Sequence, residues 1–311
     1  MDFIQPAGWS DALAVKAQRP AAVPIAGGTD LMVELNFDRR RPEALLDLTR
    51  VPELTGWTTA GGRLRIGAGT TYAALISDLG PALPGLALAA RTVGSPQIRN
   101  RGTIGGNLGS ASPAGDCHPP LLAADAEIEV ASVRGSRMIA ADDFYTGVKR
   151  NALAPDELIA AVWISPPEGP EQFSKIGTRN AMVIAVAAFS LALHPQRRSV
   201  GTGIGSAAPT PVRAVQAERF LAAALDAAGL WESRGPLPES VAGEFAALVS
   251  AAARPIDDVR GTAAYRRHAL AVLARRTLSW AWRDYRDGLP GSGSGTTGTT
   301  NGGPAAAQAG G

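Results

Sequence analysis

Residues 99–108 combine residue types that suit close contact with an anion. The stretch reads Arg-Asn-Arg-Gly-Thr-Ile-Gly-Gly-Asn-Leu, and Ala-Ser-Pro-Ala-Gly-Asp follows at 111–116. Glycines let a backbone turn sharply and approach a ligand that a Cβ atom would keep away. Backbone amides that converge on a phosphate form hydrogen bonds to a charged acceptor, each worth roughly 1.5–3 kcal/mol. We therefore expect a phosphate-binding loop here, although an ordinary glycine-rich turn has the same composition.

A second glycine-rich stretch lies far upstream, at 23–32, and reads Val-Pro-Ile-Ala-Gly-Gly-Thr-Asp-Leu-Met. Its pattern predicts a short apolar strand, a glycine pair, and then Thr29 or Asp30 as the N-cap of a helix that ends near Asn36. Such a unit leaves backbone amides free at the turn, and the positive end of the helix dipole favours a phosphate there. Two phosphate loops in one chain indicate one long ligand.

Neither stretch matches the commoner nucleotide motifs. A Gly-Lys-Ser/Thr ending, which marks a nucleoside triphosphate P-loop, is missing, and neither stretch has the Gly-x-Gly-x-x-Gly spacing of a Rossmann turn. The sequence therefore predicts a dinucleotide-binding fold of a different kind.

Proton-transfer and metal sites are not predicted. The histidines His118, His194 and His268 lie in unrelated contexts, and the sequence has no His-x-x-x-His or Cys-x-x-Cys pair. Metal sites in proteins usually need such clusters. Cys117 stands beside His118, but adjacent residues rarely orient as nucleophile and base, so we expect a small, partly buried thiol. The prediction is no catalytic residue and no metal ligand on this chain, which disfavours a hydrolase.

The elements that position the two stretches alternate between strand and helix. Strands are expected at 3–4, 44–48, 63–68, 126–132 and 157–164, helices at 10–18, 72–78, 86–92 and 119–124, and a turn at 142–147.

The last part of the chain changes character. An apolar run at 182–193 fits strand or helix by composition, and we favour a strand that pairs with 199–205 across a polar turn. Alanine-rich patterns of helical period follow at 217–227, 242–252 and 262–283. We expect a first domain at 1–176 and a second, α+β domain at 177–287. Glycine, serine, threonine and alanine dominate 288–311, so this tail is expected to be disordered.

Composition and charge narrow the class of protein. The 311 residues include 30 Lys or Arg and 28 Asp or Glu, with no basic run interleaved with aromatics, so nucleic acid is not an expected partner. The run Arg39-Arg40-Arg41 is expected on a solvated loop, with a docking patch as the alternative. No secretory signal and no apolar stretch of roughly 20 residues is visible, so we expect a soluble, cytoplasmic chain without a membrane span. Because iron–sulfur clusters usually need four thiolates and Cys117 is the single cysteine, any cluster must lie on another chain.

The order of the glycine motifs resembles one protein family. Ala-Gly-Gly-Thr-Asp-Leu at 26–31, Thr-Ile-Gly-Gly-Asn at 103–107 and Ser-Pro-Ala-Gly-Asp at 112–116 are similar to the FAD-binding subunit of the molybdenum hydroxylases. That group includes the flavin subunits of bacterial xanthine dehydrogenase and aerobic carbon monoxide dehydrogenase. The resemblance covers about residues 1–287. It implies an α+β fold, in which a two-subdomain FAD-binding domain of the PCMH/vanillyl-alcohol-oxidase type precedes a smaller α+β C-terminal domain of the carbon monoxide dehydrogenase flavoprotein type.

The resemblance also implies which residues bind FAD. The first stretch would cradle the pyrophosphate, the second would contribute to the same site, and Asp116 would hydrogen-bond near the ribose and adenine end. Val93 would flank the flavin ring where some relatives carry an aromatic residue, Ile159 would pack near the ring, and Lys175 would stabilise the anionic reduced ring. The remaining implied residues are Ile25, Ala26, Gly27, Gly28, Thr29 and Asp30 in the first stretch and Gly102, Thr103, Ile104, Gly105, Gly106 and Asn107 in the second.

Three of these positions keep a structural alternative. The alternative for Asp116 is the cap of a turn after Gly115, while Ile159 is equally explained as a plain core residue and Lys175 as a solvated lysine.

The function implied by the resemblance is electron transfer in a heteromeric oxidoreductase. FAD, bound noncovalently here, would pass electrons from 2Fe-2S clusters on a ferredoxin-like small subunit to NAD, oxygen or another acceptor. The molybdopterin cofactor would lie on a large subunit. Two alternatives stay open: a stand-alone FAD-dependent oxidoreductase with its own substrate pocket in the second domain, and a nonenzymatic nucleotide-sensing module.

Overall fold

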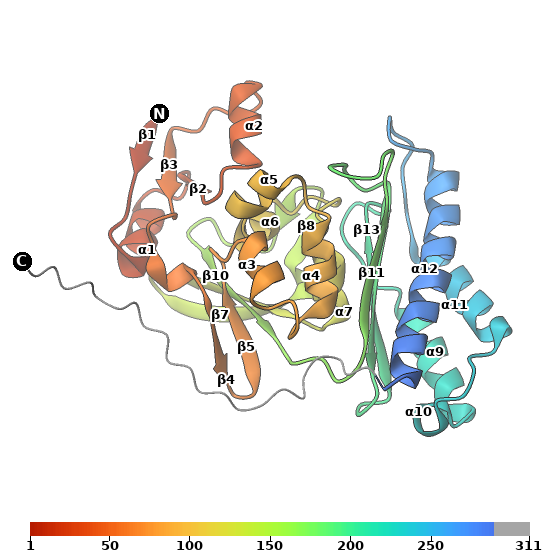
Figure 1. Cartoon of the computed structure of the whole chain (residues 1–311). Helices are drawn as coiled ribbons and strands as arrows, with labels where there is room; N and C mark the ends of the chain where they lie inside the picture. Colours follow the sequence, from red (N-terminus) through yellow and green to blue (C-terminus); the bar gives the residue numbers. More distant parts are fainter. Residues whose placement is uncertain (289–311) are drawn as a thin grey trace, which may run out of the picture.

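Residues 1–288 are described by the computed structural model, in which three main sheets follow one another along the molecule (Figure 1). The α+β class predicted from the sequence is confirmed, because helices pack on every one of these sheets. The expectation of disorder at 288–311 lies, apart from Gly288, outside the described residues. Among residues 1–288 no helix has both the length and the apolar character that crossing a membrane requires.

The first sheet is small and parallel. It consists of β1 (Asp2–Ile4), β2 (Val23–Ile25) and β3 (Ala44–Asp47), with β3 in the middle; α1 (Trp9–Gln18) contacts β3, and α2 (Leu31–Asn36) follows β2. All residues of β3 are buried, as a central strand requires. The buried ammonium of Lys16 in α1 donates to the carbonyls of Pro20 and Ala22 at 2.7 and 2.8 Å. These bonds fix the segment that enters β2 and, through it, the first glycine stretch.

The second sheet is antiparallel and has the strand order β4-β5-β10-β6-β7. Between β5 and β6 the chain forms five helices that pack beside the sheet in the middle of the molecule (Figure 1). The strands are β4 (Trp57–Ala60), β5 (Arg63–Gly67), β6 (Glu127–Ser132), β7 (Gly135–Ala140) and β10 (Leu158–Ile164). The helices are α3 (Tyr72–Ser77), α4 (Pro84–Arg91), α5 (Pro96–Arg101), α6 (Ile104–Ser110) and α7 (His118–Ala123). Their apolar faces share one core with the first sheet.

Residues 99–108, expected to be a loop, are mostly helical. They span the end of α5 and most of α6, which are separated only at Gly102 and Thr103. The Oγ1 of Thr103 accepts a hydrogen bond from the amide of Gly106 at 3.0 Å and so caps α6. The glycine content concealed this helix, because glycine disfavours helix by up to about 1 kcal/mol and the packed partners outweigh that cost.

Other local predictions also needed correction. Sequence patterns missed β4, β7 and a short 3₁₀ helix at Pro52–Leu54. The turn expected at 142–147 is the short helix α8 (Ala141–Phe144) followed by β8 (Tyr145–Gly147), which pairs with β9 (Arg150–Asn151). These elements are stabilised by neighbours in the fold, which local propensity does not report.

The third sheet consists of β11 (Glu171–Ile176), β12 (Ala187–His194) and β13 (Ser199–Gly205). It confirms the favoured strand and its hairpin partner. The predicted helices are α9 (Val215–Ala227), α11 (Glu239–Ala252) and α12 (Ala263–Arg286), joined by the short α10 (Leu230–Ser233). All of β12 is buried because α12 packs on the sheet while α7 contacts β12 and β13. Burial on both faces explains an apolar run without alternation.

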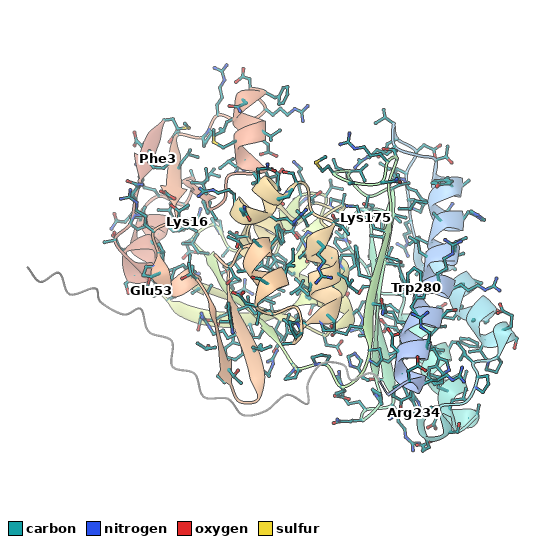
Figure 2. The ribbon with its side chains drawn as sticks, viewed as in Figure 1. Phe3, Lys16, Glu53, Lys175, Arg234 and Trp280 are labelled. Atoms are coloured by element: carbon teal, nitrogen blue, oxygen red, sulfur yellow. The ribbon has the colours of Figure 1, made fainter. Side chains whose placement is uncertain are left out.

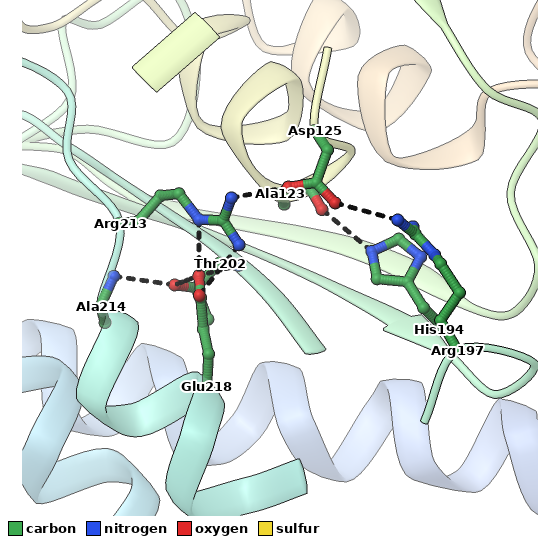
Figure 3. Close-up of polar contacts among 8 residues, drawn as sticks. All are labelled: Ala123, Asp125, His194, Arg197, Thr202, Arg213, Ala214 and Glu218. Carbon is green, nitrogen blue, oxygen red and sulfur yellow. Dashed lines mark hydrogen bonds and ion pairs between the residues drawn. The ribbon is translucent and has the colours of Figure 1, made fainter. Parts of the chain in front are cut away.

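Helix α7 lies directly on β13 and joins the second and third sheets. Cβ atoms at Gly201 and Gly203 would overlap the carbonyls of Ala123 and Pro119, so only glycine permits this approach. Polar contacts reinforce the junction (Figure 3): Asp125, just after α7, accepts from Arg213 at 2.6 Å and from Arg197 at 3.3 Å. The buried Glu218 of α9 accepts from both the amide and the hydroxyl of Thr202 and from Arg213, while a ring nitrogen of His194 contacts the carbonyl of Ala123.

Strand β11 also holds both ends of α4. The buried carboxylate of Glu171 accepts from the amide of Gly85 at the start of α4, at 3.1 Å, and the ammonium of Lys175 donates to the carbonyl of Thr92 at its end, at 3.3 Å. A hydrogen-bond acceptor suits the free amides at the N-terminus of a helix, and a positive group suits its C-terminus. The third sheet thus fixes the position of α4 and of the turn that follows it.

Glu171→Gln is expected to remove a pH dependence of stability. Burial raises the pKa of Glu171 from 4.5 to about 7, so the folded chain holds a proton there that the unfolded chain releases. The stabilisation is full below the unfolded pKa and is lost as pH rises through about 7. Relative to the variant, the wild-type free energy of unfolding should therefore fall by roughly 3 kcal/mol from acidic to mildly alkaline pH. Urea unfolding of both proteins across this range checks it; parallel pH profiles would contradict it.

Candidate cofactor-binding site

A cavity of about 690 Å³ lies where the first sheet meets the central helices, and residues of the third sheet's loops close its mouth. It is lined by the first glycine loop (residues 26–30) and by the second glycine segment (residues 102–107). The two stretches, far apart in sequence, therefore meet at one site as predicted. Every residue predicted to bind the cofactor lines this cavity except Ile104 and Lys175.

The first glycine loop presents unpaired backbone amides. Among residues 1–288, nothing accepts a hydrogen bond from the amides of Gly27, Gly28, Thr29 or Asp30. Gly28 has a φ of 74°, the left-handed conformation that favours glycine and turns the chain into α2. Consecutive free amides in such a turn form a concave anion site. This arrangement is what the sequence predicted for the loop.

The two glycine segments touch through their backbones. A Cβ atom on Gly27 would overlap the carbonyl of Arg101, and one on Gly105 would lie 2.6 Å from the Cβ of Ala68. These glycines are therefore needed for contact between parts of the protein, whereas the sequence analysis assigned them to contact with a ligand. The close junction is what places the free amides of residues 27–30 in front of the second glycine segment.

Most backbone amides of the second glycine segment donate hydrogen bonds to other groups of the protein. The amide of Ile104 donates to Thr70 and that of Gly105 to Ala68, at 3.0 and 2.8 Å. Those of Gly106 and Asn107 donate to Thr103. The prediction that amides of this stretch converge on a phosphate is therefore wrong for all four. The groups of this segment that a ligand in the cavity can contact are the Thr103 hydroxyl proton, the Asn107 side chain and the backbone of the glycines.

Asp116 and Lys175 form a buried ion pair. The ammonium nitrogen lies 2.6 Å from Oδ2 of the carboxylate, and each side chain is only 8% exposed. The Thr92 hydroxyl donates to the same oxygen at 3.1 Å. Burial raises the pKa of Asp116, and the nearby ammonium of Lys175 opposes that rise. Lys175 belongs to β11, the strand next to the central helices (Figures 1 and 2), and Asp116 lies between α6 and α7, so the pair links the third sheet to the central helices.

This pair corrects two expectations. Lys175 is not a solvated lysine, and the Asp116 carboxylate pairs with Thr92 and Lys175 and does not cap a turn. The resemblance placed Asp116 near the adenine end and Lys175 near the flavin ring, whereas the two groups are in direct contact, and of the two only Asp116 lines the cavity. Because the carboxylate neutralises the ammonium, Lys175 does not act as an isolated cation.

The three remaining apolar positions differ in role. Val93 is partly buried and lines the cavity, as expected. Ile159, 8% exposed, belongs to the core and also lines the cavity, so its packing near the flavin ring stays a prediction. Ile104 is fully buried, points into the core and does not line the cavity.

Hydrolytic and metal chemistry find no support around the cavity. Burial raises the pKa of the Cys117 thiol well above its usual range, which keeps it neutral. Burial lowers the pKa of His118 from 6.5 to about 3, and Nδ1 of its ring contacts the Tyr145 hydroxyl at 2.8 Å. Within residues 1–288, no group of histidine, cysteine and carboxylate side chains is arranged to hold a metal ion. The thiol is more deeply buried than the sequence suggested.

The unpaired groups around the cavity match the polar groups of FAD. Free amides at residues 27–30 are donors, which suit the phosphate oxygens of a dinucleotide. Buried acceptors without a partner are Oδ1 of Asn107 and Oδ1 of Asp116, which suit the hydroxyl and N–H donors of a ribityl chain and a flavin ring. The residues present therefore fit this cofactor.

The residues at the mouth of the cavity were not predicted from the sequence. Three cationic residues from separate loops line this part of the cavity. Arg40 and Lys149 both pair with Glu34, and Arg260 pairs with its near neighbour Asp258. Met182 and Ile184, 56% and 58% exposed, project from the loop between β11 and β12. The only sequence feature that pointed to these residues was the arginine run at 39–41, which the sequence analysis expected on a solvated loop. No sequence pattern indicated that these segments meet.

Two family profiles match the chain. The family described as "FAD binding domain in molybdopterin dehydrogenase" matches residues 1–167, and the family described as "CO dehydrogenase flavoprotein C-terminal domain" matches residues 173–281.

Characterised proteins are similar over nearly the whole length. The xanthine dehydrogenase FAD-binding subunit of Escherichia coli O157:H7 is 32% identical over 282 residues, which cover 88% of this chain and 92% of that protein. The carbon monoxide dehydrogenase medium chain of Afipia carboxidovorans is 32% identical over 288 residues, covering 90% and 96%. The structure of reconstituted CO dehydrogenase from Oligotropha carboxidovorans matches with a TM-score of 0.82 and 31% identity, covering 91% of this chain and 98% of that one.

Proposed function

This chain belongs to the family of FAD-binding subunits of the molybdenum hydroxylases, and from that premise we propose that the cavity between its two glycine segments holds FAD. The resemblance seen in the sequence is thereby confirmed. The chain is the FAD-carrying, electron-transferring subunit of a heteromeric oxidoreductase. When bound, FAD receives electrons from the iron–sulfur partner and delivers them to an acceptor.

The observation that supports the proposed site most directly is the run of free amides at residues 27–30, which line the same cavity as the second glycine segment. We assign these amides to the pyrophosphate. Thr103 and Asn107 would orient the cofactor from the opposite side, and Val93 and Ile159 would exclude water from the ring. The Asp116–Lys175 pair would face the ring's polar edge, where the free Oδ1 of Asp116 would accept from a ring N–H.

The division of the chain is also a proposal. Residues 1–176 would form the FAD-binding domain and 177–287 the C-terminal domain. The pairing of β11 with β12 favours a boundary slightly earlier, in the connection before Glu171, because a cut after 176 separates two bonded strands.

The partners are a small subunit with 2Fe-2S clusters and a large subunit with the molybdopterin cofactor. We propose NAD as an acceptor that approaches at the cavity mouth. There Arg40, Lys149 and Arg260 line the cavity and would offer cationic donors to the phosphates of an anionic dinucleotide. Oxygen, which needs no charged contact, is the alternative. The single, buried Cys117 agrees with the proposed cytoplasmic location, since reducing compartments keep thiols free.

Copurification tests the proposed function. We expect the tagged chain, produced in its native host, to bring down two further subunits, molybdenum, iron and noncovalent FAD. Elemental analysis and the visible spectrum measure these, and mixing the reduced complex with NAD or with oxygen identifies the acceptor. A lone yellow protein that turns over a small molecule would support the stand-alone flavoenzyme instead, and a complex that releases no FAD on denaturation would refute the FAD site.

A further inference from the structure

The turn between α4 and α5 has its carbonyls held by two cations. The guanidinium of Arg99 donates through Nη1 to the carbonyls of Val93 and Gly94, at 3.0 and 2.9 Å. The ammonium of Lys175 donates to the preceding carbonyl, that of Thr92, at 3.3 Å. Three consecutive carbonyls are therefore oriented by side chains from α5 and β11.

Fixing a carbonyl also fixes the N–H of the same peptide. The chain has no cis peptide within residues 1–288, and in a trans peptide the C=O and N–H groups point in opposite directions. Because the Val93 carbonyl points at Arg99, the N–H of Gly94 points away from Arg99. Val93 and Gly94 line the cavity and Arg99 does not, so this N–H is directed to the cavity side of the turn.

The N–H of Gly94 has no other partner. No acceptor in the described part of the chain lies within hydrogen-bond distance of it. Gly94 has a φ of 46°, and a Cβ atom there would lie 2.8 Å from Cγ2 of Ile98, so the tight turn needs glycine. Arg99 in turn has no carboxylate partner in residues 1–288, which leaves its hydrogen bonds to this turn as its observed role.

We propose that Arg99 is a positioning residue, which orients the Val93–Gly94 peptide so that the N–H of Gly94 donates to an acceptor atom of the bound flavin ring. Carbonyl oxygens and unprotonated nitrogens are the acceptors that such a ring offers to a backbone donor. The inference rests on the proposed FAD site and adds to it a donor that lies in neither glycine segment.

Arg99→Met tests the inference in the full-length chain, with Arg91→Met as the matched control. Arg91 is an exposed arginine in the last turn of α4, two residues before Val93. Loss of one oriented hydrogen bond should weaken FAD binding about five- to tenfold. It should also shift a carbonyl stretching band of bound FAD to higher frequency in the infrared spectrum. Arg99→Lys, which keeps the charge without the planar guanidinium, should lie between the variant and wild type.

The control and a second measurement keep the inference refutable. Arg91→Met should match wild type in both affinity and infrared spectrum. An unshifted carbonyl band together with wild-type affinity in Arg99→Met would overturn the inference while leaving the FAD site intact. If Arg99→Met does not fold, amide exchange at Gly94 of the wild type decides: FAD should slow it, and an unchanged rate overturns the inference. A wild-type chain that binds no FAD would refute the proposed site itself.

Discussion

Gly27→Ala is expected to abolish FAD binding at micromolar cofactor. The added Cβ would overlap the carbonyl carbon and oxygen of Arg101, and neither backbone can rotate out of the way as a side chain would. The first glycine loop must then move away from the end of α5, which takes its free amides out of line with the diphosphate. Overpacking of well-filled sites costs about 1–3 kcal/mol, so we expect a loss of affinity of about 100-fold. Titration of the FAD-free protein with FAD, followed by fluorescence quenching, measures it.

Gly243→Ala is the matched control for this prediction. Gly243 lies in α11, and a Cβ atom there would meet nothing within 4 Å. Alanine should stabilise that helix by up to about 1 kcal/mol and leave FAD affinity unchanged. Wild-type affinity in Gly27→Ala, with the fold intact by circular dichroism, would show that the two glycine segments need not touch for the cofactor to bind.

Lys175→Met is expected to destabilise the fold by about 3–5 kcal/mol at neutral pH. The substitution leaves the Asp116 carboxylate buried with only the Thr92 hydroxyl as a donor, and removing one partner of a buried ion pair has a cost of about this size. The variant also loses the bond to the Thr92 carbonyl, so α4 is held by β11 only at its first turn. Urea unfolding of the two proteins gives the difference in the free energy of unfolding.

The pH profile and a double variant separate the charge from the packing. Burial already raises the pKa of Asp116, and without the ammonium this pKa rises further. A raised carboxyl pKa stabilises the fold at low pH and loses that effect as pH rises through it, so the variant should be relatively more stable at acidic pH. Adding Asp116→Asn should recover part of the loss at neutral pH, because no charge is then left buried. A double variant as unstable as the sum of the single variants would contradict a coupled pair.

Local patterns in the sequence were sufficient for the first glycine stretch and for the long helices in the last part of the chain. The strand, glycine pair and helix at 23–36 involve neighbours within a few residues, and the helical periods of α9, α11 and α12 recur every turn. The same patterns failed at α5 and α6, where capping by Ser95 and Thr103 and packing in the core outweigh the glycines. They also failed at β4 and β7, whose stability comes from pairing with strands β5 and β6.

Residue types at short spacing were enough to find the two segments that meet at the cavity, and the resemblance of their motifs to a known family implied the family and the cofactor. Only the tertiary structure decided which amides are free: those at 27–30 face the cavity, while those at 104–107 are taken by Ala68, Thr70 and Thr103. It also decided that Asp116 neutralises Lys175 and that Arg99 orients the turn at Val93. The physical reason is that a hydrogen bond depends on where a partner lies in space, and Ala68, Thr70 and Lys175 lie far along the chain from the groups that they contact.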